Sequence, residues 1–272
     1  MSEGCNHNCE GCSVEGCGSR IEKLTPNEAS SFKHVIGIVS GKGGVGKSFV
    51  TSMLACSLAR KGFKVGILDG DITGPSIPKA FNIHEQAEGD GVQYIFPAIT
   101  KKNKIKIISS NMLLADENQP IIWRGVLISN LLKQFFTDVL WEDLDYLLID
   151  MPPGTADVTL TAFQSIPMDG IIIVTSPQDL VNLIVNKAVN MAKQMNINIL
   201  GMVENMSYVE CPKCSEKIEI YGKSNIENIS KETGINLLGR IPIRVGVSNK
   251  VDQGLIEEVE LKEFEEIVEK IV

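Results

Sequence analysis

The hydrophobic positions of the chain fall into short β-branched runs, separated by stretches in which apolar residues recur every three or four positions. The first run, residues 35–40, precedes a glycine-rich loop and then residues 49–59, whose apolar spacing predicts a helix. Further strands are expected at residues 64–68, 146–149, 170–175 and 197–203, and further helices at residues 124–137, 178–195 and 260–272. Continuous apolar strands that alternate with helices are typical of a parallel sheet covered on both faces.

Two segments depart from this alternation. Residues 91–108 contain two stretches in which polar and apolar positions alternate, and we expect them to form an antiparallel excursion from the sheet. Residues 1–20 hold almost no apolar side chain, so they need a source of order other than a hydrophobic core. We therefore expect a cysteine-rich extension over residues 1–30, followed over residues 31–272 by one α/β domain with a doubly wound, mostly parallel sheet.

Composition narrows the classes of function. The 272 residues are 43% hydrophobic and carry a net charge of −8, which argues against a surface built for nucleic acid. No apolar run approaches the roughly 18 to 20 residues that span a bilayer, so no membrane segment is expected. The first twenty residues lack the pattern of a secretion signal. We expect a cytoplasmic protein whose seven cysteines are thiols available to metals rather than paired in disulfides.

A phosphate-binding loop lies between the first strand and the first helix. It has the pattern GxxxxGK[ST] and consists of Gly41, Lys42, Gly43, Gly44, Val45, Gly46, Lys47 and Ser48. The glycines let backbone N–H groups surround an anion, and the helix N-terminus adds its dipole. Lys47 can reach the outer phosphates, and the Ser48 hydroxyl can bind Mg²⁺. The loop therefore predicts ATP or GTP binding.

Carboxylates follow two of the predicted strands, at the edge where ligands bind in an open α/β sheet. Asp150 is placed to hold the magnesium shell with support from Asp69, and Asp71 to orient or deprotonate the attacking water. Gly154 can offer its N–H to the outermost phosphate. After a later strand, Asn205 carries the donor and acceptor that adenine requires, and the turn at residues 241–244 is a candidate for the other edge of the base.

The cysteines form two candidate metal sites and one core position. Four of them, Cys5, Cys9, Cys12 and Cys17, stand within thirteen residues and can wrap one iron–sulfur cluster or one zinc ion. Their first three also have the spacing of a radical-SAM triad, but the phosphate-loop sheet that follows disfavours that chemistry. Cys211 and Cys214 form a CxxC pair in a polar loop, placed too late in the chain for a thioredoxin-like motif. Cys56, by contrast, is expected to be a small core residue.

The phosphate loop with its additional Lys42 resembles the deviant Walker A loop of dimeric ATPases, including partition and septum-positioning proteins. This resemblance implies that Lys42 reaches the nucleotide of the other subunit, where its charge assists phosphoryl transfer as an arginine finger does.

Four segments together, GKGGVGKS, DGDITGPS, DMPPGTAD and ENMSY with CPKC, resemble the Mrp/ApbC family of iron–sulfur cluster carrier ATPases over about residues 33–260. The cysteine-rich extension is similar to that of the eukaryotic cytosolic scaffold branch, although the cysteine spacing here is tighter. The resemblance implies a homodimer that binds and slowly hydrolyses ATP with Mg²⁺ and passes a labile [4Fe–4S] cluster to apo-proteins. Since one CxxC pair supplies two ligands, we expect Cys211 and Cys214 of both subunits to share that cluster.

Two rival functions share the phosphate loop. One is a positional or partition ATPase with a structural zinc site, which would need a face for membrane or DNA. The C-terminal helix is instead strongly acidic, and an anionic membrane would repel it. The other is a zinc-stabilised ATPase that transfers electrons or delivers a metal. The metal content of the protein distinguishes these possibilities.

Overall fold

The computed structural model describes residues 23–71, 74, 76–91, 93–113, 125–154, 157–177, 181–211 and 213–272. The cysteine-rich segment with Cys5, Cys9, Cys12 and Cys17 therefore lies outside the described residues, and so does its predicted metal site.

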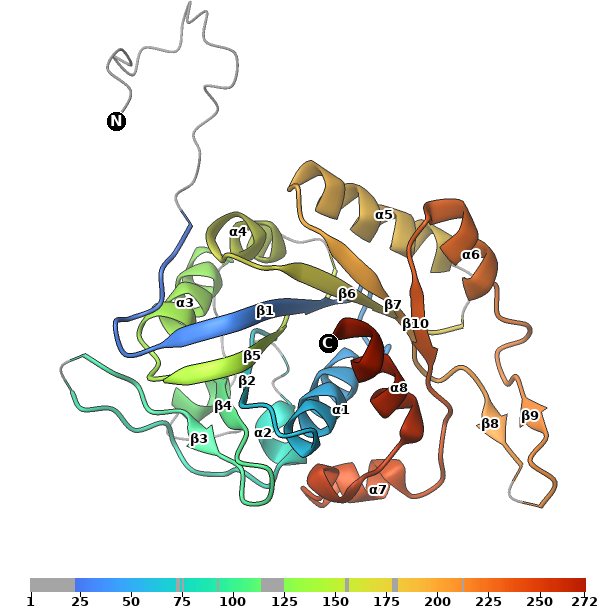
Figure 1. The fold of residues 1–272 in the computed structure, drawn as a ribbon, viewed down its shortest axis with the longest axis horizontal. Coiled ribbons are helices and arrows are strands. Elements are labelled where there is room, and N and C mark those ends of the chain that lie inside the picture. The colour runs from blue at the N-terminus through green and yellow to red at the C-terminus, as the bar shows by residue number, and fades with distance from the viewer. Residues whose placement is uncertain are drawn as a thin grey trace, which may run out of the picture.

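Within the described residues, an eight-stranded sheet forms the centre of the molecule (Figure 1). Its strands are β1 (Ser31–Val39), β2 (Val65–Asp69), β3 (Ala98–Ile99), β4 (Lys106–Ser109), β5 (Asp143–Asp150), β6 (Gly170–Thr175), β7 (Ile199–Glu204) and β10 (Leu237–Arg240). They lie in the order β10-β7-β6-β1-β5-β2-β4-β3, and β3 alone among them is antiparallel to its neighbour. The chain thus winds outward from β1 in both directions, which confirms the doubly wound, mostly parallel α/β fold.

Helices cover both faces of the sheet (Figure 1). They are α1 (Lys47–Arg60), α2 (Ile77–Ala80), α3 (Gly125–Thr137), α4 (Asp157–Ser165), α5 (Val181–Gln194), α6 (Ile226–Thr233), α7 (Val247–Asp252) and α8 (Lys262–Ile271), with single 3₁₀ turns η1 (Ser110–Leu113) and η2 (Ile256–Glu258). The helices α3, α4, α5 and α6 lie on one face, while α1 and α8 pack together on the other, with α2 and α7 beside them.

The core explains why the strands read as uninterrupted apolar runs. In β5 the consecutive residues Leu147, Leu148 and Ile149 are all fully buried, because helices cover the sheet on both sides. The helix α1 is likewise buried along nearly its whole length between the sheet and α8. Its Cys56 is a buried core residue as predicted, and burial raises the pKa of its thiol to about 12.

The expectation for residues 91–108 was partly wrong. β4 is no excursion but a member of the main sheet, parallel to β2, with Ile107 opposite Ile67. Its consecutive residues Ile107 and Ile108 are both buried, so the strand is covered on two faces rather than one. Only the two-residue β3 pairs with it in the antiparallel sense. In the other predicted stretch, Ile95 forms two isolated bridges, an antiparallel one to Gly89 and a parallel one to Val139, instead of belonging to a strand.

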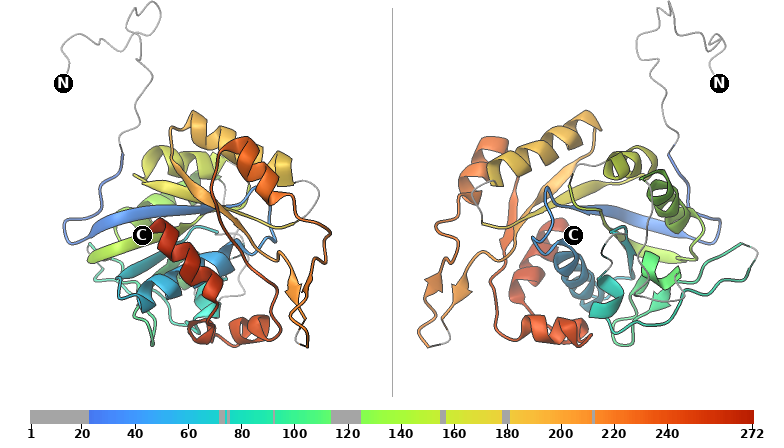
Figure 2. Two further views of the ribbon diagram at one scale, coloured as in Figure 1. Left: turned by 45° about the vertical axis from the view of Figure 1, so that its right-hand side comes forward. Right: turned by 180° about the vertical axis from the view of Figure 1, so that it is seen from behind.

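Between β7 and α6 the chain forms a small antiparallel hairpin that stands away from the main sheet (Figure 2). Its strands are β8 (Val209–Glu210) and β9 (Lys217–Ile218). At its base, the Ile243 N–H donates to the Tyr208 carbonyl at 2.7 Å, which fixes the hairpin to the segment after β10. The described helices include none that is both long enough and apolar enough to cross a bilayer.

Candidate functional site

The loop between β1 and α1 has the backbone that a phosphate-binding loop requires. Gly44 and Gly46 have φ values of 79° and 78°, in the left-handed region that glycine adopts without steric cost. Gly46 caps α1, and no side chain satisfies the first N–H groups of the helix. These donors and the positive end of the helix dipole therefore remain available for an anion.

Three side chains of α1 converge on Asp150 at the end of β5. The Lys47 ammonium lies 2.7 Å from Oδ2 of Asp150, and the Ser48 hydroxyl donates to the same oxygen at 2.6 Å. The Thr51 hydroxyl donates to Oδ1 at 2.7 Å. Lys47 and Asp150 are 5% and 0% exposed, so each depends on the other for its charge to be tolerated. The structure thus brings together three of the predicted residues, whereas Thr51 was not predicted.

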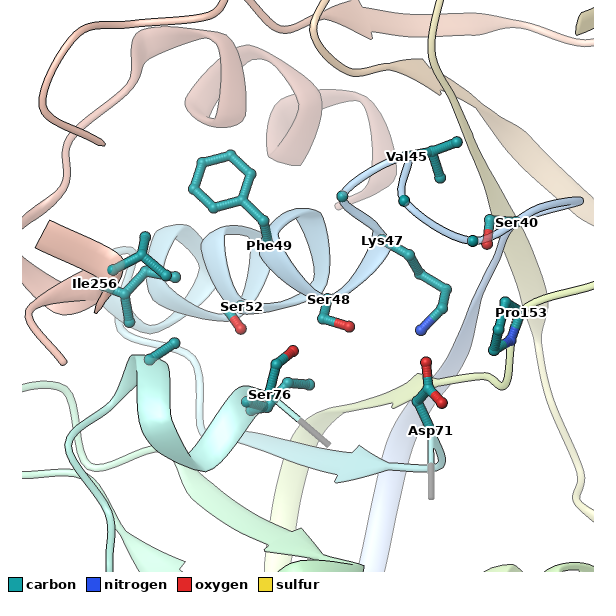
Figure 3. A pocket seen from close by; sticks show the side chains of 16 residues that line it. Ser40, Val45, Lys47, Ser48, Phe49, Ser52, Asp71, Ser76, Pro153 and Ile256 are labelled. Atoms are coloured by element: carbon teal, nitrogen blue, oxygen red, sulfur yellow. The ribbon is translucent and has the colours of Figure 1, made fainter. Parts of the chain in front are cut away.

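A cavity of about 310 Å³ opens over this group (Figure 3). Lys47, Ser48, Asp71 and Ser40 all line it, and Lys47 and Asp71 project into it from opposite walls. The remaining wall residues come from the phosphate loop, α1, α2, the segment before α4, α7 and η2, and are Gly43, Gly44, Val45, Gly46, Phe49, Ser52, Ser76, Ile77, Ala80, Pro153, Val251 and Ile256. A cavity of this size that joins a cation, hydroxyls and a carboxylate suits a polyphosphate with its metal ion.

Two buried carboxylates lie side by side beneath the cavity. Asp69 is paired with Asp150 across β2 and β5, and it accepts hydrogen bonds from the Ser109 hydroxyl at 2.9 Å and the Asp71 N–H at 3.1 Å. Burial, together with the charge of Asp150, raises the pKa of Asp69 to about 8, although Lys47 and these hydrogen bonds oppose the shift. Asp69 therefore holds its proton near neutral pH when no cation is bound, and a divalent cation beside the pair would favour the ionised carboxylate.

The side chains present fit a magnesium ion. Mg²⁺ prefers oxygen ligands and is held in phosphate sites by one or two protein groups together with phosphate oxygens. Ser48 supplies a hydroxyl that lines the cavity, and Asp150 supplies the carboxylate that is hydrogen-bonded to it, with Asp69 opposite Asp150 on the neighbouring strand. These are the residues that would hold the ion.

The other predicted nucleotide residues lie around the same cavity or next to it. Gly154 has a φ of 85°, and its N–H donates to the Ser40 carbonyl at 2.9 Å, so contact with a phosphate would require exchange of this hydrogen bond. Lys42 and Gly41 are half-buried in the phosphate loop.

Asn205 lies directly against the phosphate loop. Its amide nitrogen donates to the Val45 carbonyl at 2.9 Å, and a Cβ at Gly46 would come within 2.2 Å of the same nitrogen. Asn205 and Met206 also line a second cavity of about 270 Å³, together with Phe49 and Pro242. This cavity has mainly apolar walls and continues from the phosphate loop, as a pocket for a flat base would.

Arg244 belongs to the wall of that second cavity. Its guanidinium lies 2.7 Å from the Glu263 carboxylate on α8, so it is paired rather than a solvated charge. Glu263 on α8 and Glu257 in η2 are both buried, and Glu257 accepts hydrogen bonds from the Thr100 hydroxyl and the Asn103 N–H.

Cys211 and Cys214 occupy the tip of the hairpin. The Cys211 N–H donates to the Glu216 carbonyl, and Ser215 adopts a φ of 58° to close the turn. Hydrogen bonds from the Lys213 and Cys214 N–H groups, and then from the Cys214 thiol, lower the pKa of Cys211, which favours the thiolate that binds metals. Among the described residues no group of three or more His, Cys, Asp or Glu side chains could hold a metal ion, and the hairpin offers two thiols.

The sheet, the loop and the cavity together define the class of the protein: it is a P-loop nucleotide-binding protein of the doubly wound α/β type. Over residues 31–272 it matches the model of the NUBPL iron-transfer P-loop NTPases within the ParA group, and the chain belongs to this family.

Relatives of known name agree with this assignment. The iron-sulfur cluster carrier protein of Clostridium perfringens is 44% identical, over 92% of this chain and 90% of its own. The protein of the same name from Methanocaldococcus jannaschii is 44% identical, over 98% and 96% of the two chains. Among solved structures, the nucleotide-binding protein of Archaeoglobus fulgidus in complex with ADP is similar, with a TM-score of 0.76 and 39% identity over 86% of this chain and 91% of that one.

Proposed function

We propose that the protein is an ATP-hydrolysing carrier that assembles a labile [4Fe–4S] cluster and transfers it to apo-proteins. The observation that carries this proposal is the pair of thiols on an exposed hairpin of a P-loop NTPase, Cys211 and Cys214, which can fill only half of a four-ligand site. The names of the relatives and the ADP complex of the Archaeoglobus protein support it.

In this proposal each residue of the nucleotide site has a defined role. Lys47 turns from Asp150 to the outer phosphates, and Ser48 and Asp150 are the residues that would hold Mg²⁺, with Asp69 next to Asp150. Asp71, on the opposite wall of the cavity, orients or deprotonates the attacking water. The Gly154 N–H gives up its hydrogen bond to the Ser40 carbonyl and donates to the γ-phosphate instead.

The base and the second subunit complete the site. The Asn205 amide nitrogen is engaged by Val45, so its carbonyl oxygen is the group that accepts from the amino group of adenine. Lys42 acts on the nucleotide of the other subunit in a homodimer.

The cluster is cargo rather than a resident cofactor. Cys211 and Cys214 of two subunits together supply four thiolates, and their exposed position at a seam allows an acceptor protein to take the cluster. Cys5, Cys9, Cys12 and Cys17 hold a separate cluster or a zinc ion. A reducing compartment such as the cytoplasm keeps all of these thiols available.

The test is anaerobic reconstitution of Cys211→Ala with Cys214→Ala, followed by iron and sulfide analysis and transfer to an apo-protein. We expect the variant to lose the transferable cluster and to keep nucleotide binding. Cys56→Ala removes a thiol from the core instead and should retain the cluster. A double variant that still donates a full complement of cluster would overturn the carrier role of the hairpin, and zinc in place of iron in the native protein would favour the positional ATPase.

A further inference from the structure

A buried carboxylate lies at the base of the hairpin that carries Cys211 and Cys214. Glu204, the last residue of β7, is 1% exposed and accepts hydrogen bonds from hydroxyls on both sides of the hairpin, Ser207 before it and Ser224 after it. We call Glu204, Ser207, Ser224, Arg240 and Glu219 the Glu204 cluster.

Arg240 joins the two sides of the hairpin to this carboxylate. Its Nε lies 3.1 Å from Glu204 and 2.7 Å from the Ser207 hydroxyl, and its terminal nitrogen lies 3.0 Å from Glu219, directly after β9. The guanidinium also faces the ring of Tyr208, which lies directly before β8. Charged hydrogen bonds are strong and directional where water is largely excluded, so the cluster holds the base of the hairpin in one geometry.

The residue after Glu204 is Asn205, which lies against the phosphate loop. Its side chain donates to Val45, its N–H donates to the Thr175 carbonyl at 2.8 Å, and with Met206 it lines the proposed base pocket. The segment from Asn205 to Cys211 is held by further backbone bonds, from Ser207 to Ile241 and from Ile243 to Tyr208. Because these bonds restrain the segment, we expect a displacement of Asn205 to be transmitted to Cys211 and Cys214.

We infer that Glu204 and Arg240 are positioning residues that make the Cys211–Cys214 hairpin move with Asn205, so that nucleotide binding changes the exposure and metal affinity of the two thiols. A ligand shifts a conformational equilibrium only through contacts that differ between the two states, and a nucleotide in the pocket would touch Asn205 and Met206 directly. This inference rests on the proposed function, because it takes the hairpin as the cluster site.

The test compares full-length protein with Arg240→Gln, which removes the charge that joins Glu204 to Glu219. Alkylation rates of Cys211 and Cys214 by N-ethylmaleimide are measured by peptide mass spectrometry with and without a non-hydrolysable ATP analogue and Mg²⁺. In the native protein we expect the analogue to change these rates by about tenfold, the usual size of coupling between sites, and in Arg240→Gln by less than about twofold. The same ratio is measured for the rate of cluster loss to a chelator after anaerobic loading.

Controls separate positioning from general stability. Lys223→Gln removes one positive charge from an exposed part of the same segment and should keep the native ratio. Arg240→Lys, which can still pair with Glu204, should recover part of it. A purely structural role would change the rates without nucleotide and leave the ratio intact. If Arg240→Gln fails to fold, the same ratio of alkylation rates is measured in Glu219→Gln, which removes the charge of Glu219 and leaves the pair between Arg240 and Glu204 in place.

The outcomes also distinguish this inference from the proposed function. A native ratio of one, or a native-like ratio in a folded Arg240→Gln protein, overturns the inference even if the cluster is carried normally. Nucleotide-dependent alkylation that disappears in Arg240→Gln, in a protein that never holds a cluster at the hairpin, supports the positioning role and refutes the carrier role.

Discussion

At the scale of single residues, the site depends on how one carboxylate is shared. Asp150 accepts from Lys47, Ser48 and Thr51, and residues 47 and 51 lie one helical turn apart on the same side of α1. The Thr51 hydroxyl donates to Oδ1 of Asp150, so Lys47 and Ser48 share the other oxygen, Oδ2. When Lys47 turns to a phosphate, Asp150 therefore keeps two hydroxyl donors and a fixed orientation.

Lys47→Ala should weaken nucleotide binding by about tenfold to a hundredfold, the range expected for loss of a charged hydrogen bond to phosphate. The change also leaves Asp150 buried without its cation, so the variant should melt at a lower temperature. Affinity is measured by titration with a fluorescent ATP analogue. Lys61→Ala, beyond the far end of the same helix, is the matched control, and native affinity in folded Lys47→Ala protein would contradict the assigned role.

Asp69 predicts a dependence of stability on pH. Because its pKa is raised to about 8, folded protein holds this proton at pH values where the unfolded chain has released it. The resulting contribution to the free energy of unfolding is complete at acidic pH and is lost as the pH rises through about 8. Metal-free Asp69→Asn should therefore lose stability less steeply between about pH 5 and pH 9 than native protein does.

Guanidinium denaturation in the presence of a chelator measures this slope. Asp143→Asn changes an exposed carboxylate at the start of β5 and should keep the native slope. Equal slopes for native protein and Asp69→Asn would show that Asp69 is ionised in the folded state.

At the scale of elements, the phosphate loop and the end of β7 form one unit. The loop turns through two left-handed glycines, and the second of them makes room for the Asn205 side chain. The helix α1 thus begins where three segments meet, namely β1, β5 through Asp150, and β7 through Asn205. The loop is held in its anion-binding shape by tertiary contacts as well as by its own glycines.

The two left-handed glycines allow these contributions to be separated. Gly44→Ala meets nothing within 4 Å, so it should cost only the strain of a left-handed alanine, about 1 kcal/mol. Gly46→Ala carries the same strain and in addition forces Asn205 away from the loop. We expect Gly46→Ala to lose clearly more stability in chemical denaturation and to bind nucleotide more weakly. Equal losses in the two variants would show that the contact with Asn205 is dispensable.

At the scale of the whole molecule, the described chain has one pair of thiols on the hairpin, half of the ligands that the proposed cluster site needs, and one nucleotide cavity beside the phosphate loop. Both features are completed if two copies face each other, as symmetric dimers do, because each copy then contributes the same patch to the other. The hairpin, the second cavity and the phosphate loop lie along one edge of the sheet, so a single face can join all three.

Mixing two inactive variants tests action between subunits. A Lys42→Ala subunit keeps Asp71, and an Asp71→Asn subunit keeps Lys42, so a mixed dimer has one complete site if Lys42 acts in trans. An equal mixture that exchanges subunits freely should recover about a quarter of the native ATPase rate, because half of the dimers are mixed and each holds one site. Rates that stay at the average of the two variants at every mixing ratio would exclude action in trans.

Local sequence patterns were sufficient for much of this protein. The phosphate loop is recognisable because its eight residues are consecutive, and the apolar runs of β1, β5 and β6 report burial on both faces. Asp69, Asp71 and Asp150 could be assigned to the site because the carboxyl ends of parallel strands meet at one edge. The N-terminal cysteines and the domain boundary at residue 30 remain predictions.

The remaining features depend on which segments become neighbours. The sequence did not predict β10 or the hairpin, because both are short and their polar residues show no period. In the structure β10 pairs with β7, and the hairpin forms a bridge to Ile243. Polar and apolar positions alternate over residues 104–107, yet β4 is a member of the main sheet and is covered on both faces. Arg240 meets Glu204 across 36 positions, and Asn205 meets Val45 across 160. The hydrophobic period of a segment indicates only which of its residues are buried. Contacts between distant residues, such as these two, depend on strand order and packing, which the tertiary structure alone decides.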